Sequence, residues 1–151
     1  MIESLDIKRF RNLDELKIGS LSKINLITGK NNTGKSTLLE AIALYITHCD
    51  LNIIYQLLRE RGEYYQQNLS SINVTESNLK ALSSFFSNRT VGYTKNNAII
   101  IGTIEQTLFG KQDTFEKSVS LRFVKFFDEL NNQDEVTVNR RKRTIIENGD
   151  S

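Results

Sequence analysis

The chain has 151 residues, of which 38% are hydrophobic and 25% are charged, and its formal net charge is +2. This length suffices for one domain with a hydrophobic core, and the composition excludes an intrinsically disordered chain. The longest aliphatic run, at 98–101, is far shorter than the ~20 apolar residues that cross a membrane. The first residues lack the basic and apolar regions of a signal peptide, and Cys49, the single cysteine, has no partner for an intramolecular disulfide. We therefore expect a cytoplasmic protein without a membrane segment.

The N-terminal part predicts a strand, a loop and a helix in succession. Apolar and charged residues alternate at 5–7 and at 16–18, which predicts two short strands that pair as a hairpin. Ile24–Ile27 predicts a third strand, and the small polar residues after it predict a loop. Apolar residues then recur at helical spacing over Lys35–Ile46, so we expect a helix there.

Apolar spacing predicts further elements along the rest of the chain, with a glycine ending one helix and a serine capping another. The expected elements are a helix over Leu51–Arg61 ended by Gly62, a helix over about Ser77–Phe86 capped by Ser77, strands over Ala98–Ile104 and Val119–Phe127, and a hairpin over Glu135–Glu147 that turns at Asn139–Lys142.

The loop between the third strand and the first helix carries a phosphate-binding pattern. Residues Gly29–Ser36 read G-x-x-x-x-G-K-S, the Walker A or P-loop motif. Gly29 and Gly34 allow backbone angles that turn successive N–H groups inward, and the helix that follows directs its positive end at the same point. Lys35 offers a mobile positive charge to the β- and γ-phosphates and is the predicted catalytic residue, and the Ser36 hydroxyl is a ligand for Mg²⁺.

The residues around this loop resemble a known family. Phe10-Arg11 ends the first predicted strand, Asn31 lies inside the glycine loop, and residues 38–42 read Leu-Leu-Glu-Ala-Ile. This block resembles the opening of the ABC-type ATPases of the OLD (overcoming lysogenization defect), RecF and SMC branch, and the Asn31-Asn32 pair is most similar to OLD-type members. The resemblance implies ATP and Mg²⁺ as cofactors, and it implies that Arg11 lies against the nucleotide rather than in solvent.

The loop and the resemblance together predict one nucleotide-binding set. Its members are Arg11, Gly29, Asn31, Asn32, Thr33, Gly34, Lys35, Ser36 and Thr37. They also predict an α/β P-loop NTPase fold, an ABC-ATPase-like lobe with a mixed sheet that contains the P-loop strand and an antiparallel β-region after residue 98. We expect a single lobe over 1–151, divided at residues 50 and 90 into a P-loop segment, a helical segment and a β-rich segment.

Family members complete their site with an apolar strand that ends in acids, a Ser-Gly-rich signature and a late histidine, and none is evident here. We therefore interpret the chain as an incomplete ATPase domain. Asp128 follows the strand predicted to end at Phe127 and is the candidate for a Mg²⁺-side carboxylate. Arg122 and Lys125 in that strand oppose the role, because such strands are buried on both faces and continuously apolar. An exposed charge is the alternative for Asp128.

Four consecutive cations, Arg140, Arg141, Lys142 and Arg143, fall in the predicted terminal hairpin. A solvated turn explains them without a function. A contact with DNA phosphates is the alternative, since the resembled family works on DNA.

Three functions are compatible with these patterns. The first is an ATP-binding lobe of an ABC-type ATPase that acts on DNA or in defence against phage, as a homodimer or with a partner ATPase subunit. Such a lobe would bind ATP and hydrolyse it poorly alone. The second is a non-catalytic or truncated nucleotide-binding module that regulates a complete ATPase. The third is a compact P-loop kinase or NTPase that uses Asp128.

Overall fold

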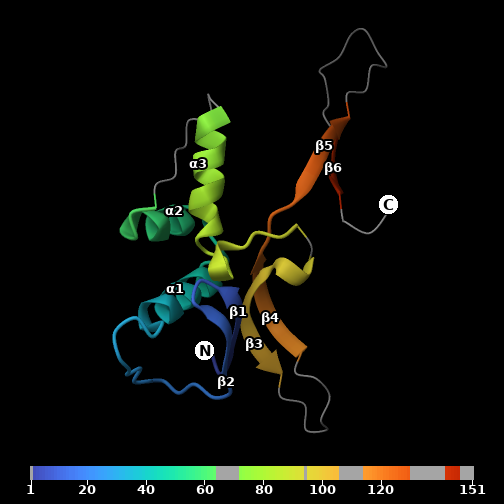
Figure 1. Ribbon diagram of the computed structural model, residues 1–151. Coiled ribbons are helices and arrows are strands. Elements are labelled where there is room, and N and C mark those ends of the chain that lie inside the picture. The colour runs from blue at the N-terminus through green and yellow to red at the C-terminus, as the bar shows by residue number, and fades with distance from the viewer. Residues whose placement is uncertain (1, 64–71, 94, 106–113, 130–141, 147–151) are drawn as a thin grey trace.

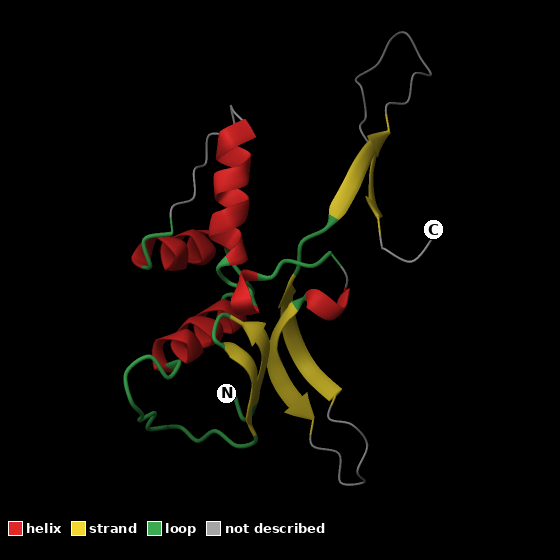
Figure 2. Cartoon of the chain, in the orientation of Figure 1, coloured by secondary structure: helices red, strands yellow, loops and turns green. Residues whose placement is uncertain are grey.

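The computed structural model describes residues 2–63, 72–93, 95–105, 114–129 and 142–146 (Figure 1). Figure 2 shows the helices grouped beside a sheet, with a second, smaller pair of strands projecting from it. The elements are β1 (Leu5–Phe10), β2 (Leu13–Ile18), α1 (Lys35–Ile46), α2 (Leu51–Glu60), α3 (Ile72–Ser83), the short 3-10 helices η1 (Ser87–Arg89) and η2 (Lys95–Asn97), β3 (Ile99–Glu105), β4 (Thr114–Leu121), β5 (Lys125–Glu129) and β6 (Lys142–Ile146).

The main sheet has four strands in the order β2-β1-β3-β4, and every neighbouring pair is antiparallel. The predicted N-terminal hairpin is confirmed, because Ile7 of β1 lies opposite Leu16 of β2. Ile7 also lies opposite Ile101 on the other side, where β3 confirms the strand predicted from the β-branched run. β1 is thus hydrogen-bonded along both edges. Its position inside the sheet fixes the position of Arg11, which directly follows its C-terminal end.

The strand predicted at Ile24–Ile27 is wrong. This segment lies in the long loop between β2 and α1, drawn in green in Figure 2. A strand needs a neighbour for its backbone hydrogen bonds, and this segment pairs with none of the described strands. The Asn25 side chain instead closes a local turn with the backbone N–H and C=O of Ser22, at 2.9 and 2.8 Å. The side chains of Ile24 and Leu26 are left 91% and 89% exposed.

The fold class predicted from the sequence therefore needs a correction. The described sheet is antiparallel rather than mixed, and the phosphate-loop segment does not lie inside it. Of the strands after residue 98, β3 and β4 extend this sheet, since β3 pairs directly with β1, whereas β5 and β6 form a separate antiparallel pair. The prediction of a domain that contains both helices and a sheet is confirmed.

The helices cover one face of the sheet and enclose the core. The predicted helix over Lys35–Ile46 is confirmed as α1, and its buried residues Leu38, Ala41 and Leu44 join Ile7 and Ile101 in one apolar cluster. α2 confirms the helix that was expected to end near Gly62. Its apolar residues lie on one stripe and pack against the same cluster, as amphipathic spacing predicts.

The helix predicted from Ser77 begins earlier, at Ile72, and ends at Ser83. Ser77 is therefore an interior residue and not an N-cap, a position that costs a helix little. Phe85 and Phe86 leave the helix because they pack elsewhere. Phe85 stacks on Phe10 with ring centroids 5.9 Å apart, and Phe86 forms an isolated bridge with Phe10. The chain after α3 is thereby held at the end of β1.

The C-terminal strands also differ from the prediction. The single strand expected over Val119–Phe127 is divided into β4 and β5, which lie in different sheets. β6 pairs with β5, with Phe126 opposite Ile145, so Lys142 belongs to a strand and not to the turn predicted there. The other residues of the predicted turn, at 139–141, lie outside the described residues. None of the described helices is long and apolar enough to cross a membrane.

Cys49 follows α1 and is half-buried against the core. Burial raises the pKa of its thiol, because the thiolate is poorly solvated there. We expect Cys49 to react slowly with iodoacetamide at pH 8 and to react faster only as the pH rises above the usual range of a thiol. Mass spectrometry of the native and urea-unfolded chain measures this. Equal rates for the two forms would contradict a desolvated thiol.

Candidate functional site

The glycine loop and the first turn of α1 form one side of the site. Gly34 is the N-cap of α1 and has φ 97°, in the left-handed region that favours glycine. A Cβ at Gly34 would lie 3.0 Å from Leu13 Cδ2 and 3.2 Å from Asn12 Nδ2. The loop therefore packs closely on the turn between β1 and β2. This contact brings the start of α1 next to Arg11, which lies in that turn.

The ammonium group of Lys35 turns back onto its own loop. Its Nζ donates to the carbonyl oxygens of Gly29 and Lys30, at 2.8 and 2.6 Å. The Thr33 hydroxyl donates to the same Lys30 carbonyl, at 2.8 Å. These bonds close the loop around the base of the lysine side chain. They involve carbonyl oxygens alone, so an anion of higher charge would compete for the ammonium group.

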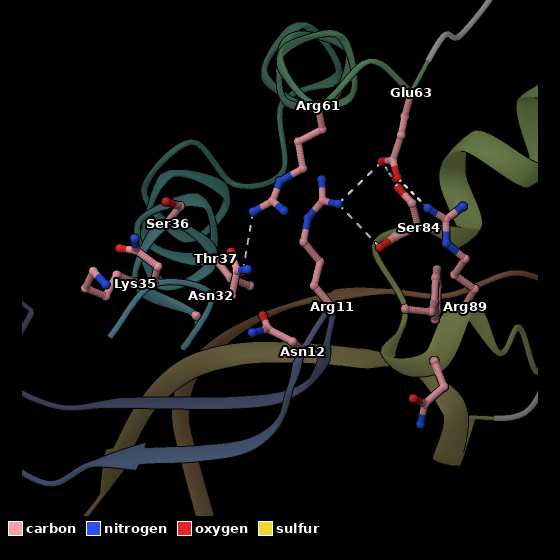
Figure 3. Close-up of a pocket in the computed structure, with 14 residues that line it drawn as sticks. Arg11, Asn12, Asn32, Lys35, Ser36, Thr37, Arg61, Glu63, Ser84 and Arg89 are labelled. Atoms are coloured by element: carbon pink, nitrogen blue, oxygen red, sulfur yellow. Dashed lines mark hydrogen bonds and ion pairs between the residues drawn. The ribbon is translucent and has the colours of Figure 1, made fainter. Parts of the chain in front are cut away.

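A cavity of about 760 Å³ lies between this loop and the far end of β1. Its volume is within the range of small-molecule sites, and its lining is mostly polar and charged. It is lined by Arg11, Asn12, Asn31, Asn32, Gly34, Lys35, Ser36, Thr37, Arg61, Glu63, Ser84, Phe86, Asn88 and Arg89. Figure 3 shows Lys35, Ser36 and Thr37 on one side, Arg11 and Arg61 converging in the middle, and Glu63, Ser84 and Arg89 on the other side.

Arg11 is held in an unusual backbone conformation at the floor of this cavity. Its φ is 53°, a left-handed value that is uncommon outside glycine and asparagine. Its backbone N–H donates to the Phe85 carbonyl at 2.8 Å, and its guanidinium carbon lies 4.6 Å from the centre of the Phe85 ring. Such a residue persists only where its surroundings over-determine it.

Five charges of alternating sign connect the elements around the cavity. Arg61 pairs with Glu40 at 2.6 Å, and Glu40 pairs with Arg11 Nε at 2.7 Å. Arg11 then pairs with Glu63 at 3.4 Å, and Glu63 pairs with Arg89 at 2.8 Å. We call this set the arginine–glutamate chain. Its two ends are open, since the side chains of Arg61 and Arg89 are 37% and 58% exposed.

The middle of the arginine–glutamate chain is buried. The Arg11 side chain is only 7% exposed. Desolvation lowers its pKa, nearby Glu40 acts in the opposite direction, and the neighbouring Arg61 lowers the pKa further. An arginine keeps its charge through such changes. Arg11 Nη2 makes no hydrogen bond within the part of the chain that the structure describes. A buried donor of this kind beside a cavity suits an anionic ligand.

The structure brings most of the sequence-predicted nucleotide set together. Seven members line the cavity: Arg11, Asn31, Asn32, Gly34, Lys35, Ser36 and Thr37. Gly29 and Thr33 do not line it and act within the loop, where Gly29 accepts from Lys35 and Thr33 donates to Lys30. Ser36 is the only one of these residues that was predicted as a Mg²⁺ ligand. Among the described residues, no cluster of three or more histidine, cysteine or acidic side chains could hold a metal ion.

The structure does not bring the C-terminal candidates to the cavity. Asp128 lies in β5, opposite Arg143 of β6, in the two-stranded sheet that projects from the main body (Figure 1). Lys142 lies in the same small sheet, and Arg140 and Arg141 fall outside the described residues. The expectation of a compact site completed by Asp128 therefore gains no support from the position of β5.

Sequence reasoning missed Arg61, Glu63, Ser84 and Arg89. Ser84 accompanies the ion pairs, since its hydroxyl donates to Glu63 Oε2 and its carbonyl oxygen lies 3.5 Å from Arg11 Nη1. These residues come from the ends of α2 and α3 and from η1, so no local spacing links them to the glycine loop. The only signal in the sequence is that Arg61 closes the predicted α2 helix just before a glycine.

A glycine loop at the start of a helix, facing a basic cavity beside a sheet, fits the P-loop class of NTPases. Residues 1–148 match the sequence model of the AAA ATPase domain. The chain therefore belongs to the AAA ATPase domain family. The sequence-based assignment to an AAA or ABC-type P-loop ATPase is confirmed at this level.

Individual relatives agree with the family. An uncharacterised protein of Methanocaldococcus jannaschii is 36% identical over an alignment of 101 residues that covers 60% of this chain and 46% of that protein. An ATP/GTP phosphatase of Helicobacter pylori is 55% identical over 42 residues, covering 28% of this chain and 11% of that protein. The DNA replication and repair protein RecF of Idiomarina loihiensis is 51% identical over 43 residues, covering 28% and 12% respectively.

The aligned region is thus less than half the length of each of these curated relatives. No solved structure is significantly similar to the chain. The family is established by sequence, while the site geometry comes from this structure alone.

Proposed function

We propose that this chain is a nucleotide-binding lobe that binds ATP with Mg²⁺ through the Gly29–Ser36 loop. The observation that carries the proposal is the cavity of about 760 Å³, which is lined on one side by Lys35 and Ser36 and in the middle by the cationic side chains of Arg11 and Arg61. Family membership and the RecF and ATP/GTP phosphatase relatives support ATP as the ligand and ATPase activity as the function of the complete assembly.

Each residue of the loop has a role that follows from its chemistry. The N-terminus of α1 presents free backbone N–H groups, which favour an anion together with the helix dipole. Lys35 exchanges the carbonyl oxygens of Gly29 and Lys30 for phosphate oxygens, because an ammonium interacts more strongly with a charged acceptor. Ser36 offers its hydroxyl to the metal ion. Five or six charge-assisted hydrogen bonds of about 1.5–3 kcal/mol each exceed the cost of association enough for millimolar to micromolar affinity.

Hydrolysis by this chain alone should be slow. Mg²⁺, when bound, would neutralise charge on the phosphates, and Lys35 would stabilise charge that develops during transfer. A carboxylate that orients water is also needed. Among the described lining residues Glu63 is the only carboxylate, and it is already engaged by Arg11, Ser84 and Arg89. This engagement favours the second candidate function, a non-catalytic nucleotide-binding module, over an independent enzyme.

Calorimetric titration with ATP and Mg²⁺ tests the proposal, and phosphate release by the same sample separates the two candidates. We expect saturable binding with a dissociation constant between about 1 mM and 1 μM, and phosphate release close to the uncatalysed rate. The absence of binding at several times the upper value would overturn the proposal. Rapid turnover without a partner would overturn the non-catalytic candidate.

A finer assignment extends the proposal to the OLD-type branch, as a cytoplasmic homodimer or partner subunit active in DNA transactions or defence against phage. The Asn31-Asn32 pair in the loop supports the OLD-type assignment. The RecF relatives, described as DNA replication and repair proteins, support a role with DNA. The cations at 140–143 supply a short basic segment for phosphate contacts.

If 140–143 contacts DNA phosphates, replacing all four cations with alanine should weaken binding to a random duplex about equally for every sequence. The loss should grow at low salt, and the slope of log affinity against log salt should become shallower by about three to four. Fluorescence anisotropy at several salt concentrations measures both quantities. Unchanged affinity and slope in the fourfold variant would leave these cations as a solvated segment.

A further inference from the structure

A cation that no sequence motif marks lies in the middle of the cavity, next to the first turn of α1. Arg61 is the C-cap residue of α2, directly after the last helical residue, and its side chain lines the cavity. Its Nη2 lies 3.4 Å from the hydroxyl of Thr37, which belongs to the first turn of α1. Arg61 thus reaches across from α2 to the part of α1 where the backbone N–H groups are free (Figure 3).

The neighbours of Arg61 orient its guanidinium group but leave some of its N–H donors without an acceptor among the described residues. Glu40 Oε1 accepts a hydrogen bond from Arg61 Nε at 2.7 Å and forms an ion pair with Nη2 at 2.6 Å. These bonds fix the plane of the guanidinium group on one edge. Among the described residues, no bond is formed by Nη1, and the side chain is 37% exposed. A guanidinium held in this way can donate from Nη1 to a phosphate oxygen, and a phosphate that replaces the Thr37 hydroxyl as the acceptor of Nη2 would be bound in a bidentate arrangement.

The excess of positive charge around Arg61 also favours the binding of an anion. Three arginines and Lys35 line the cavity, and the two glutamates of the arginine–glutamate chain offset only two of these four positive charges. Arg11 and Arg61 share Glu40 and oppose each other electrostatically. Arg11 is buried and fixed by Glu63 and the Phe85 ring, whereas Arg61 is half-open to the cavity. Of the two, Arg61 has the more exposed side chain, at 37% against 7% for Arg11.

We infer that Arg61 contacts the phosphate chain of the bound nucleotide directly, while Arg11 acts as a positioning residue that holds Glu40 and, through it, Arg61. This inference rests on the proposed function, since it assumes that the glycine loop binds a nucleoside polyphosphate. It adds to the glycine loop a second phosphate contact, made by an arginine at the end of α2. It also couples nucleotide binding to the position of α2.

The test compares calorimetric titrations of ATP and of inorganic triphosphate, which has no base or sugar. We expect Arg61→Ala to weaken both ligands by a similar factor, about 10- to 100-fold, because each loses the same charge-assisted hydrogen bonds. Arg59→Ala is the matched control, since Arg59 is an exposed arginine of α2 that does not line the cavity. It should change either affinity by no more than about twofold through the loss of a distant surface charge. Arg61→Lys should recover only part of the loss, because a lysine cannot offer the planar fork.

Each contrary result is specific. Equal affinities for the Arg61→Ala and Arg59→Ala variants would overturn the phosphate contact, and the proposed function would still stand if Lys35→Ala weakened ATP binding by about 10-fold or more. Weaker ATP binding with unchanged triphosphate binding would place Arg61 on the nucleoside and overturn the inference as well. Failure of the unmodified chain to bind either ligand would overturn both the inference and the proposed function. Thermal unfolding of the unliganded variants checks that Arg61→Lys retains the fold.

Discussion

Replacing Lys35 with alanine should lower the affinity for ATP more than any other single change in the loop. The variant loses one ammonium group and its charge-assisted hydrogen bonds, each worth about 1.5–3 kcal/mol. One such bond corresponds to a factor of about 10 to 150 in the dissociation constant. Calorimetric titration with ATP and Mg²⁺ measures the effect. The fold should be retained, because the Lys35 ammonium contacts only carbonyl oxygens of the loop.

Lys30→Ala is the matched control for this change. Lys30 belongs to the same loop and is exposed, but its side chain does not line the cavity, and only its backbone carbonyl takes part in the loop's hydrogen bonds. We expect its affinity for ATP to remain within a factor of about two, as for the loss of a solvated surface charge. Similar losses in the two variants would mean that general positive charge, and not the placement of Lys35, determines affinity.

Replacing Arg11 with alanine should destabilise the chain strongly even without nucleotide. Arg11 is 7% exposed, and its removal leaves Glu40 and Glu63, which are 13% and 17% exposed, without their shared cation. Breaking a buried ion pair by removing one partner costs about 3–5 kcal/mol. The contact of Arg11 with the Phe85 ring is lost as well. Urea unfolding monitored by circular dichroism should show this decrease in the free energy of unfolding.

Two further variants separate charge from backbone strain. Arg11→Gly removes the same charge but relieves the left-handed φ of 53°, so it should be about 1 kcal/mol more stable than Arg11→Ala. Arg59→Ala removes an exposed arginine and should change stability by less than about 0.5 kcal/mol. If Arg11→Ala is as stable as Arg59→Ala, the arginine–glutamate chain does not hold this site together. The affinity of the folded Arg11→Ala variant for ATP then tests separately whether Arg11 positions Glu40 and Arg61.

The parts of the site that could be predicted from sequence are local in the chain. The glycine loop and α1 are contiguous, and helical spacing together with two fixed glycines defines both. The β1–β2 hairpin is local in the same sense, because its strands alternate clearly and are joined by a short turn. The family resemblance also predicted that Arg11 lies against the nucleotide, and this contact stays a prediction. The structure places it in the cavity wall, with a burial that the sequence did not indicate.

The parts that could not be predicted depend on partners far away in the sequence. Arg11 and Glu63 are 52 residues apart, and no spacing rule relates them. A strand depends equally on its neighbours. Ile24–Ile27 has the composition of a strand, but no described strand lies beside it. Conversely, β5 and β6 pair across 130–141, where the sequence favoured a tighter hairpin. Composition predicts what a segment can form, and pairing with a strand that is distant in the sequence decides whether it does.

A crystal structure of the chain with a non-hydrolysable ATP analogue and Mg²⁺ tests the central claim most directly. We expect the three phosphates to lie in the Gly29–Ser36 loop, with Lys35 Nζ moved from the carbonyl oxygens of Gly29 and Lys30 to the phosphates. An analogue bound elsewhere would contradict the account. So would a saturated crystal in which Lys35 keeps both carbonyl bonds and no anion lies between the loop and Arg61.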